Sequence, residues 1–134
     1  PYYERLTGRA HSYGMKVIQH SCGYNRELID DLCDAGIDCL QFDQPLVYDL
    51  PELAAKLRSH GVGLFSPCDI QSVLPTGDRE LIERESRRLV DTFTGGFIAK
   101  NYPDIEGIGI AAEWDSWAYE AFVEAGGGAG KRVS

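Results

Sequence analysis

Four glycine positions divide the chain into similar units, and they constrain its fold more than any other feature. Gly14, Gly36, Gly61 and the pair Gly95-Gly96 each follow an amphipathic segment and precede a short apolar run. Glycine is the usual residue where a helix ends in the left-handed conformation. The pattern therefore predicts a helix, a glycine stop and a buried strand, repeated four times.

The apolar runs predict strands over residues 15–19, 37–42, 62–65 and 97–100. Between them, apolar side chains recur at the helical spacing, and an aromatic helix is expected over 113–125. Strands that alternate with helices are typical of βα units, which pair their strands in parallel. We expect an α/β fold with four parallel strands. It is either an open doubly wound sheet or half of a (β/α)8 barrel.

Local signals suggest where helices begin and where the domain stops. Asn25 is a candidate N-cap for the first helix after a strand, and Thr76 or Asp78 is a candidate for the third. Residues 1–125 form one predicted domain. The run of glycines that follows predicts a flexible tail over 126–134.

Composition excludes several classes of partner. The chain has 134 residues, with 13 basic against 21 acidic side chains and a net charge of −8, which argues against a nucleic-acid partner. No apolar run approaches the length that crosses a bilayer. The four cysteines, Cys22, Cys33, Cys39 and Cys68, lie in a regular α/β pattern rather than in a small disulfide-rich chain. We therefore expect reduced thiols and a cytoplasmic location.

His20 and Cys22 lie where the first predicted strand gives way to a glycine turn. Parallel α/β proteins do their chemistry at this end of their strands, and Zn²⁺ binds imidazole and thiolate together. Cys68 is the other cysteine at the same predicted edge, so it is a candidate third ligand. The alternative is a histidine bonded to a backbone carbonyl beside a packed thiol.

Other polar side chains follow the remaining strands. Asp43 and Asp69 suit proton transfer or the anchoring of polar substrate groups, and Tyr102 can donate a hydrogen bond to a carboxylate. Aspartate is also common after strands as a turn former or a helix cap. Both interpretations stay open for the two aspartates.

Several short motifs together resemble one enzyme family. They are His-Ser-Cys-Gly-Tyr at 20–24, Ala-Gly-Ile-Asp at 35–38, Asp-Gln-Pro at 43–45, Gly-Asp-Arg-Glu-Leu-Ile at 77–82, and Gly-Phe-Ile-Ala at 96–99 followed by Tyr-Pro-Asp at 102–104. Their order and spacing resemble the uroporphyrinogen decarboxylase superfamily from about residue 2 to residue 122. That family forms (β/α)8 barrels, so the resemblance implies that this chain is the C-terminal half of such a barrel.

The resemblance implies two kinds of chemistry. One branch of the family decarboxylates the acetate groups of uroporphyrinogen without a cofactor. Another branch consists of zinc-dependent methyltransferases that move a methyl group from a corrinoid to a thiol such as coenzyme M. His20 and Cys22 match the His-x-Cys zinc ligands of that second branch, and Asp69 matches the family's aspartate after the seventh strand.

The chain departs from both branches at the last strand. The methyltransferases place their third zinc ligand, a cysteine, there, whereas this chain has Gly95-Gly96-Phe97, and Cys68 lies one strand earlier. The decarboxylases have a histidine before the Tyr-Pro-Asp segment, where this chain has Ala99 and Lys100.

Three functions are therefore expected. The first is a parent methyltransferase with Zn²⁺ on His20, Cys22 and Cys68, a thiol and a methylcorrinoid as substrates, and a corrinoid protein as partner. The second is a cofactor-free decarboxylase that binds a porphyrinogen and lines its pocket with Asp69, Tyr102 and Asp43. The third is a non-catalytic fragment that self-associates through its open sheet edges.

Overall fold

The structure, a computed structural model, describes residues 2–127 and contains five α-helices and one four-stranded sheet in that range. The helices are α1 (Tyr2–His11), α2 (Ile29–Asp34), α3 (Leu50–His60), α4 (Arg79–Thr92) and α5 (Ala112–Ala125). The strands are β1 (Ile18–His20), β2 (Cys39–Gln41), β3 (Gly63–Ser66) and β4 (Phe97–Ala99). Single 3-10 turns, η1 (Arg26–Leu28), η2 (Pro45–Val47) and η3 (Leu74–Thr76), precede α2, α3 and α4.

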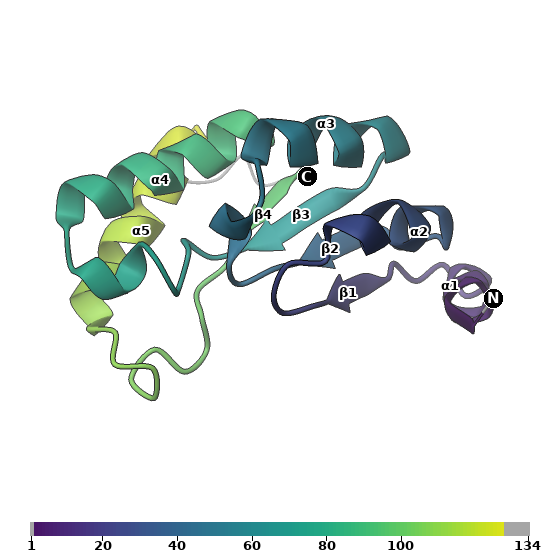
Figure 1. Ribbon diagram of the computed structural model, residues 1–134, viewed down its shortest axis with the longest axis horizontal. Helices are drawn as coiled ribbons and strands as arrows, with labels where there is room; N and C mark the ends of the chain where they lie inside the picture. Colours follow the sequence, from purple (N-terminus) through teal and green to yellow (C-terminus); the bar gives the residue numbers. More distant parts are fainter. Residues whose placement is uncertain (1, 128–134) are drawn as a thin grey trace.

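All neighbouring strands pair in parallel, in the order β1-β2-β3-β4. This confirms the predicted α/β fold of parallel βα units. Helices α2, α3 and α4 lie on one side of the sheet, and α5 lies beside α4 (Figure 1). Among residues 2–127 no helix covers the opposite side. A doubly wound sheet carries helices on both faces, so that alternative does not describe this layer.

The predicted glycine stops after the helices are confirmed. Gly14, Gly36, Gly61 and Gly95 all adopt the left-handed conformation, with φ between +67° and +87°. The first strand starts later than predicted, at Ile18 rather than at residue 15. The reason is local, because the Val17 amide donates to the Asp38 carboxylate at 2.8 Å instead of to a neighbouring strand.

The predicted helix starts have mixed outcomes. Asp78 caps α4, because its carboxylate accepts a hydrogen bond from the Leu81 amide at 3.1 Å. The expectation for Asn25 is wrong: it precedes η1 and its side chain makes no capping bond. The predicted aromatic helix is present as α5. Most of the predicted tail, residues 128–134, lies outside the described residues.

The hydrophobic core lies between the sheet and its helices. Leu40 and Leu64 are fully buried there, and Phe97 packs against the same cluster. On the opposite side of the sheet, Ile18 and Ile98 are 53% and 52% exposed. Strand residues therefore alternate between a packed face and an open face. Of the helices described, none combines the length and apolar character that a bilayer crossing needs.

This asymmetry predicts a large difference between two substitutions in adjacent strands. Leu64→Ala removes a fully buried side chain from the packed face and should lower the free energy of unfolding by about 2–5 kcal/mol. Ile98→Ala, on the open face, should cost less than about 1 kcal/mol. Denaturant unfolding followed by circular dichroism measures both. Equal costs would contradict the one-sided core.

Candidate functional site

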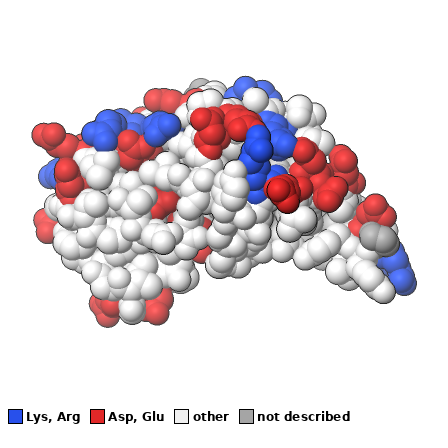
Figure 2. All heavy atoms as spheres, viewed as in Figure 1, with Lys and Arg blue, Asp and Glu red and all other residues white. Residues whose placement is uncertain are grey.

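The carboxyl ends of the four parallel strands lie together at one end of the sheet, which we call the carboxyl edge. The register places His20, Gln41, Phe65 and Ile98 side by side across the strands, on the face without helices. In Figure 2 the charged side chains gather mainly over the helices, whereas the middle of the view below the sheet is largely uncharged. Charged groups are therefore few in this part of the view, and the placement of those near the carboxyl ends of the strands is informative.

His20 and Cys22 are brought together on this edge. The imidazole Nε2 of His20 lies 3.2 Å from Sγ of Cys22, and both residues are exposed. The two atoms belong to the last residue of β1 and to the turn that follows it. The structure thus places an accessible nitrogen atom and an accessible sulfur atom beside each other, as the spacing predicts.

The turn that carries Cys22 is held by two side chains, one from the same loop and one from the residues between η2 and α3. Gly23 is left-handed, with φ of +76°, which lets the chain reverse directly after Cys22. The Asn25 amide donates to the Cys22 carbonyl at 2.8 Å and to the Ser21 hydroxyl at 2.7 Å. The Tyr48 hydroxyl donates to the Gly23 carbonyl at 3.0 Å, and its ring stacks on Phe42. The pair therefore stands on a braced turn rather than on a free loop.

Cys68 lies away from this pair. It is 1% exposed, and its Sγ lies 4.0 Å from the Ile82 carbonyl of α4, on the packed side of the sheet. Burial raises the pKa of the Cys68 thiol to about 12, and the Ser86 hydroxyl offsets only part of that rise. Within residues 2–127 no three His, Cys, Asp or Glu side chains form a group that could hold a metal ion. The geometry therefore does not make Cys68 a third ligand.

Both carboxylate oxygens of Asp69 accept hydrogen bonds from the chain itself. It is 2% exposed, and its Oδ1 accepts bonds from the Gln71 and Ser72 amides and from the Ser72 hydroxyl, at 2.7–2.9 Å. Its Oδ2 accepts the Leu46 amide at 3.1 Å. These bonds tie the loop after β3 to the loop after β2, which is the turn-forming role of aspartate.

Asp43 and Tyr102 both lie near Lys100, a residue to which the motifs assigned no role. Lys100 follows β4, and its Nζ lies 2.9 Å from Asp43 Oδ1 and 5.9 Å from the centre of the Tyr102 ring. Gln41 donates its amide to the same Asp43 oxygen at 2.7 Å. Two of the predicted site residues are therefore neighbours of one partly buried lysine.

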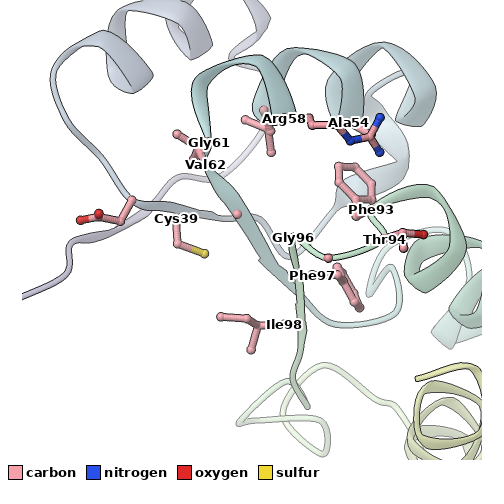
Figure 3. A pocket seen from close by; sticks show the side chains of 14 residues that line it. Cys39, Ala54, Arg58, Gly61, Val62, Phe93, Thr94, Gly96, Phe97 and Ile98 are labelled. Carbon is pink, nitrogen blue, oxygen red and sulfur yellow. The ribbon is translucent and has the colours of Figure 1, made fainter. Parts of the chain in front are cut away.

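A pocket of about 470 Å³ lies elsewhere, at the amino ends of β3 and β4 (Figure 3). Its walls include Ala54 and Arg58 of α3, Phe93 after α4, and Cys39 of β2. It lies at the end of the sheet opposite to His20 and Cys22. Parallel α/β proteins place their chemistry at the carboxyl ends, so we do not assign the function to this pocket.

No protein-family model, no curated protein and no solved structure matches the chain. The residues at the carboxyl edge and their geometry are therefore the basis for assigning a function.

The sequence indicated Lys100 only as a departure from the decarboxylases, and it did not indicate Tyr48. Lys100 carried a usable signal, because strict alternation along the predicted strand 97–100 places it on the same face as Ile98. Tyr48 carried none, because its role depends on the path of the loop that it holds. The same is true of Asn25, whose amide bonds the Cys22 turn rather than a helix end.

The burial of the thiols predicts selective labelling. Cys22 is exposed, whereas Cys33, Cys39 and Cys68 are buried, and burial raises the pKa of each of these three thiols. A water-soluble aromatic disulfide should therefore release the equivalent of one thiol per folded chain and of four in denaturant. Cys22→Ser should abolish the reaction of the folded chain. Rapid reaction of a second thiol in the folded chain would contradict the described burial.

Proposed function

We propose that this chain is the C-terminal half of a (β/α)8 barrel of the uroporphyrinogen decarboxylase superfamily, and that its parent transfers a methyl group to a thiol at a zinc centre. Helices cover only one face of the parallel sheet, which is the arrangement of a barrel wall with its interior face open. The motifs that resemble that superfamily support the reaction class.

The observation that carries the proposal is the distance between the two donor atoms on the edge. Tetrahedral zinc with ordinary Zn–N and Zn–S bonds holds its nitrogen and sulfur ligands about 3.5 Å apart. Nε2 of His20 and Sγ of Cys22 lie 3.2 Å apart. Two ligands of one tetrahedral zinc ion would need a separation only slightly larger than this one.

These two residues fit part of a zinc centre. A catalytic zinc has three protein ligands and one open position, so one further protein ligand is required from outside residues 2–127. Bound zinc would hold the substrate thiol as a thiolate, which is nucleophilic at neutral pH. The braced turn contributes by fixing Cys22 relative to the end of β1, so that both donors face the open side together.

The decarboxylase alternative has less support. Its expected pocket residue Asp69 is buried, and both of its oxygens accept hydrogen bonds from the chain itself. Asp43 is paired with Lys100. Tyr102 keeps its predicted place near the edge. A porphyrinogen substrate would therefore find fewer available polar groups than that mechanism needs.

Cobalt(II) is a spectroscopic substitute for zinc and tests the proposal directly. Added to the metal-free chain, it should produce a thiolate-to-cobalt charge-transfer band because Cys22 binds it. Cys22→Ser should remove the band and weaken metal binding by about tenfold or more, which corresponds to about 1.4 kcal/mol. Cys33→Ala is the matched control, since it removes a buried thiol of α2 and should leave the band unchanged.

Two other outcomes would contradict the zinc proposal. Absence of the band together with tight porphyrin binding would favour the decarboxylase. Absence of both, with self-association that depends on protein concentration, would favour the non-catalytic fragment.

A further inference from the structure

The pocket at the amino ends of β3 and β4 has features that the proposed zinc centre does not explain. Its volume of about 470 Å³ lies within the range of about 300–1,000 Å³ that is usual for small-molecule sites. In Figure 3, Gly96 lies between Arg58 and Phe93 on one side and Cys39 and Ile98 on the other. The pocket therefore extends from the ends of the helices to the open face of the sheet.

Four of the described residues that line this pocket are glycines: Gly61, Gly63, Gly95 and Gly96. Gly61 and Gly95 are left-handed, with φ of +67° and +79°, so the backbone favours glycine there. Gly63 begins β3 and Gly96 directly precedes β4, and neither has a positive φ. The backbone conformation therefore does not require glycine at positions 63 and 96.

Close packing does not require these two glycines either. A β-carbon at position 63 would lie 3.4 Å from the Gly96 carbonyl oxygen, and one at position 96 would lie 3.8 Å from the Phe93 carbonyl oxygen. Both distances are ordinary van der Waals contacts. Glycine weakens a strand, and it often marks a place that a ligand approaches closely. Gly63 and Gly96 therefore keep this hollow open although the fold accommodates alanine.

The walls of the pocket toward the helices are apolar. Ala54 and Leu57 of α3 and Phe93 after α4 are buried core residues that also line the pocket. Val62, which directly precedes β3, continues the same wall. Apolar surface of a ligand is removed from water when it lies against such walls. They therefore favour a ligand with a hydrocarbon part.

Arg58 supplies a positive charge that no described side chain neutralises. Its guanidinium donates to the Thr92 carbonyl at 3.4 Å, and no carboxylate among residues 2–127 pairs with it. A guanidinium has five N–H donors, so most of them remain available. Among the described residues of the lining only Asp38 is acidic, and Lys16 and His11 lie 2.7 Å from its carboxylate oxygens. The pocket therefore favours an anionic group beside Arg58.

We propose that this pocket binds a small free monocarboxylate with an apolar tail. The tail lies along the apolar wall over Gly63 and Gly96, and the carboxylate pairs with Arg58, whose planar fork suits two oxygens at once. A second carboxylate would find no further Lys or Arg among the described residues of the lining, on a chain with a net charge of −8. The site shares no residue with the His20 and Cys22 pair, so binding here is independent of the metal and goes beyond the proposed function.

Three probes with the same carbon chain test the proposal. Octanoate carries a carboxylate, 1-octanol an uncharged hydroxyl, and octylammonium a positive charge. Titration calorimetry on the metal-free chain should show that octanoate binds about tenfold or more tightly than 1-octanol, as expected for a hydrogen bond between charged groups. Octylammonium should not bind. Equal affinities for octanoate and 1-octanol would overturn the proposal.

Arg58→Gln identifies the partner of the carboxylate. It should weaken octanoate binding by about tenfold or more and leave the affinity for 1-octanol unchanged. Arg84→Gln is the matched control, because it removes the same charge from an exposed position of α4 outside the pocket, and it should change neither affinity. A preference for octanoate that survives Arg58→Gln would contradict the proposed contact.

Gly96→Ala distinguishes a ligand site from a glycine that the fold requires. The added methyl group occupies the hollow without strain, so the melting temperature should equal or exceed that of the unaltered chain. Octanoate affinity should fall by about fourfold, since the methyl displaces the contact of about one methylene group. Gly63→Ala should act in the same way from β3.

Gly8→Ala is the control for the added methyl group, because position 8 lies in α1 with nothing within 4 Å, and it should leave octanoate affinity unchanged. Two results for the pocket variants would overturn the proposal. One is an octanoate affinity that neither Gly96→Ala nor Gly63→Ala alters. The other is a melting temperature that both variants lower strongly, which would show that the fold itself requires these glycines.

Discussion

Backbone hydrogen bonds between parallel strands bring the ends of the strands, and the candidate-site residues that follow them, to one end of the sheet. They continue past the regular strands, from the Ser21 amide to Gln41 and from the Lys100 amide to Ser66, at 3.1 and 3.2 Å. Because all strands run in the same direction, residues that follow them in the sequence meet at one edge. Because side chains alternate along a strand, one face carries the core and the other carries the candidate site. A one-residue shift in the pairing of one strand would move its side chains to the opposite faces, so it would displace core residues and candidate-site residues together.

Two different supports act on this frame. The turn after β1 is braced by Tyr48 and Asn25, which fixes the exposed donors of His20 and Cys22. The ion pair of Asp43 and Lys100 is instead fixed by burial over Phe65. One support places a nitrogen and a sulfur atom 3.2 Å apart at the end of β1, and the other holds two opposite charges 2.9 Å apart.

Much of this arrangement follows from local sequence. Glycines with positive φ mark the helix ends, and alternating apolar segments gave the parallel fold, because both signals depend only on near neighbours. The meeting of His20 with Cys22 was predictable for the same reason. The roles of Asn25 and Asp69 were not predictable. An asparagine can cap a helix or hold a turn, and an aspartate can bind a substrate or hydrogen-bond within its own loop. Lys100 needed the strand order, because its partner lies two strands away.

The central claim is that His20 and Cys22 bind one metal ion together. X-ray absorption at the zinc edge of the zinc-loaded chain measures the ligands directly. The account predicts one sulfur at about 2.3 Å and at least one imidazole nitrogen at about 2.0 Å. The sulfur contribution should disappear in Cys22→Ser, and the imidazole contribution should disappear in His20→Ala. A first shell of oxygen and nitrogen atoms without sulfur in the unaltered chain would contradict the claim.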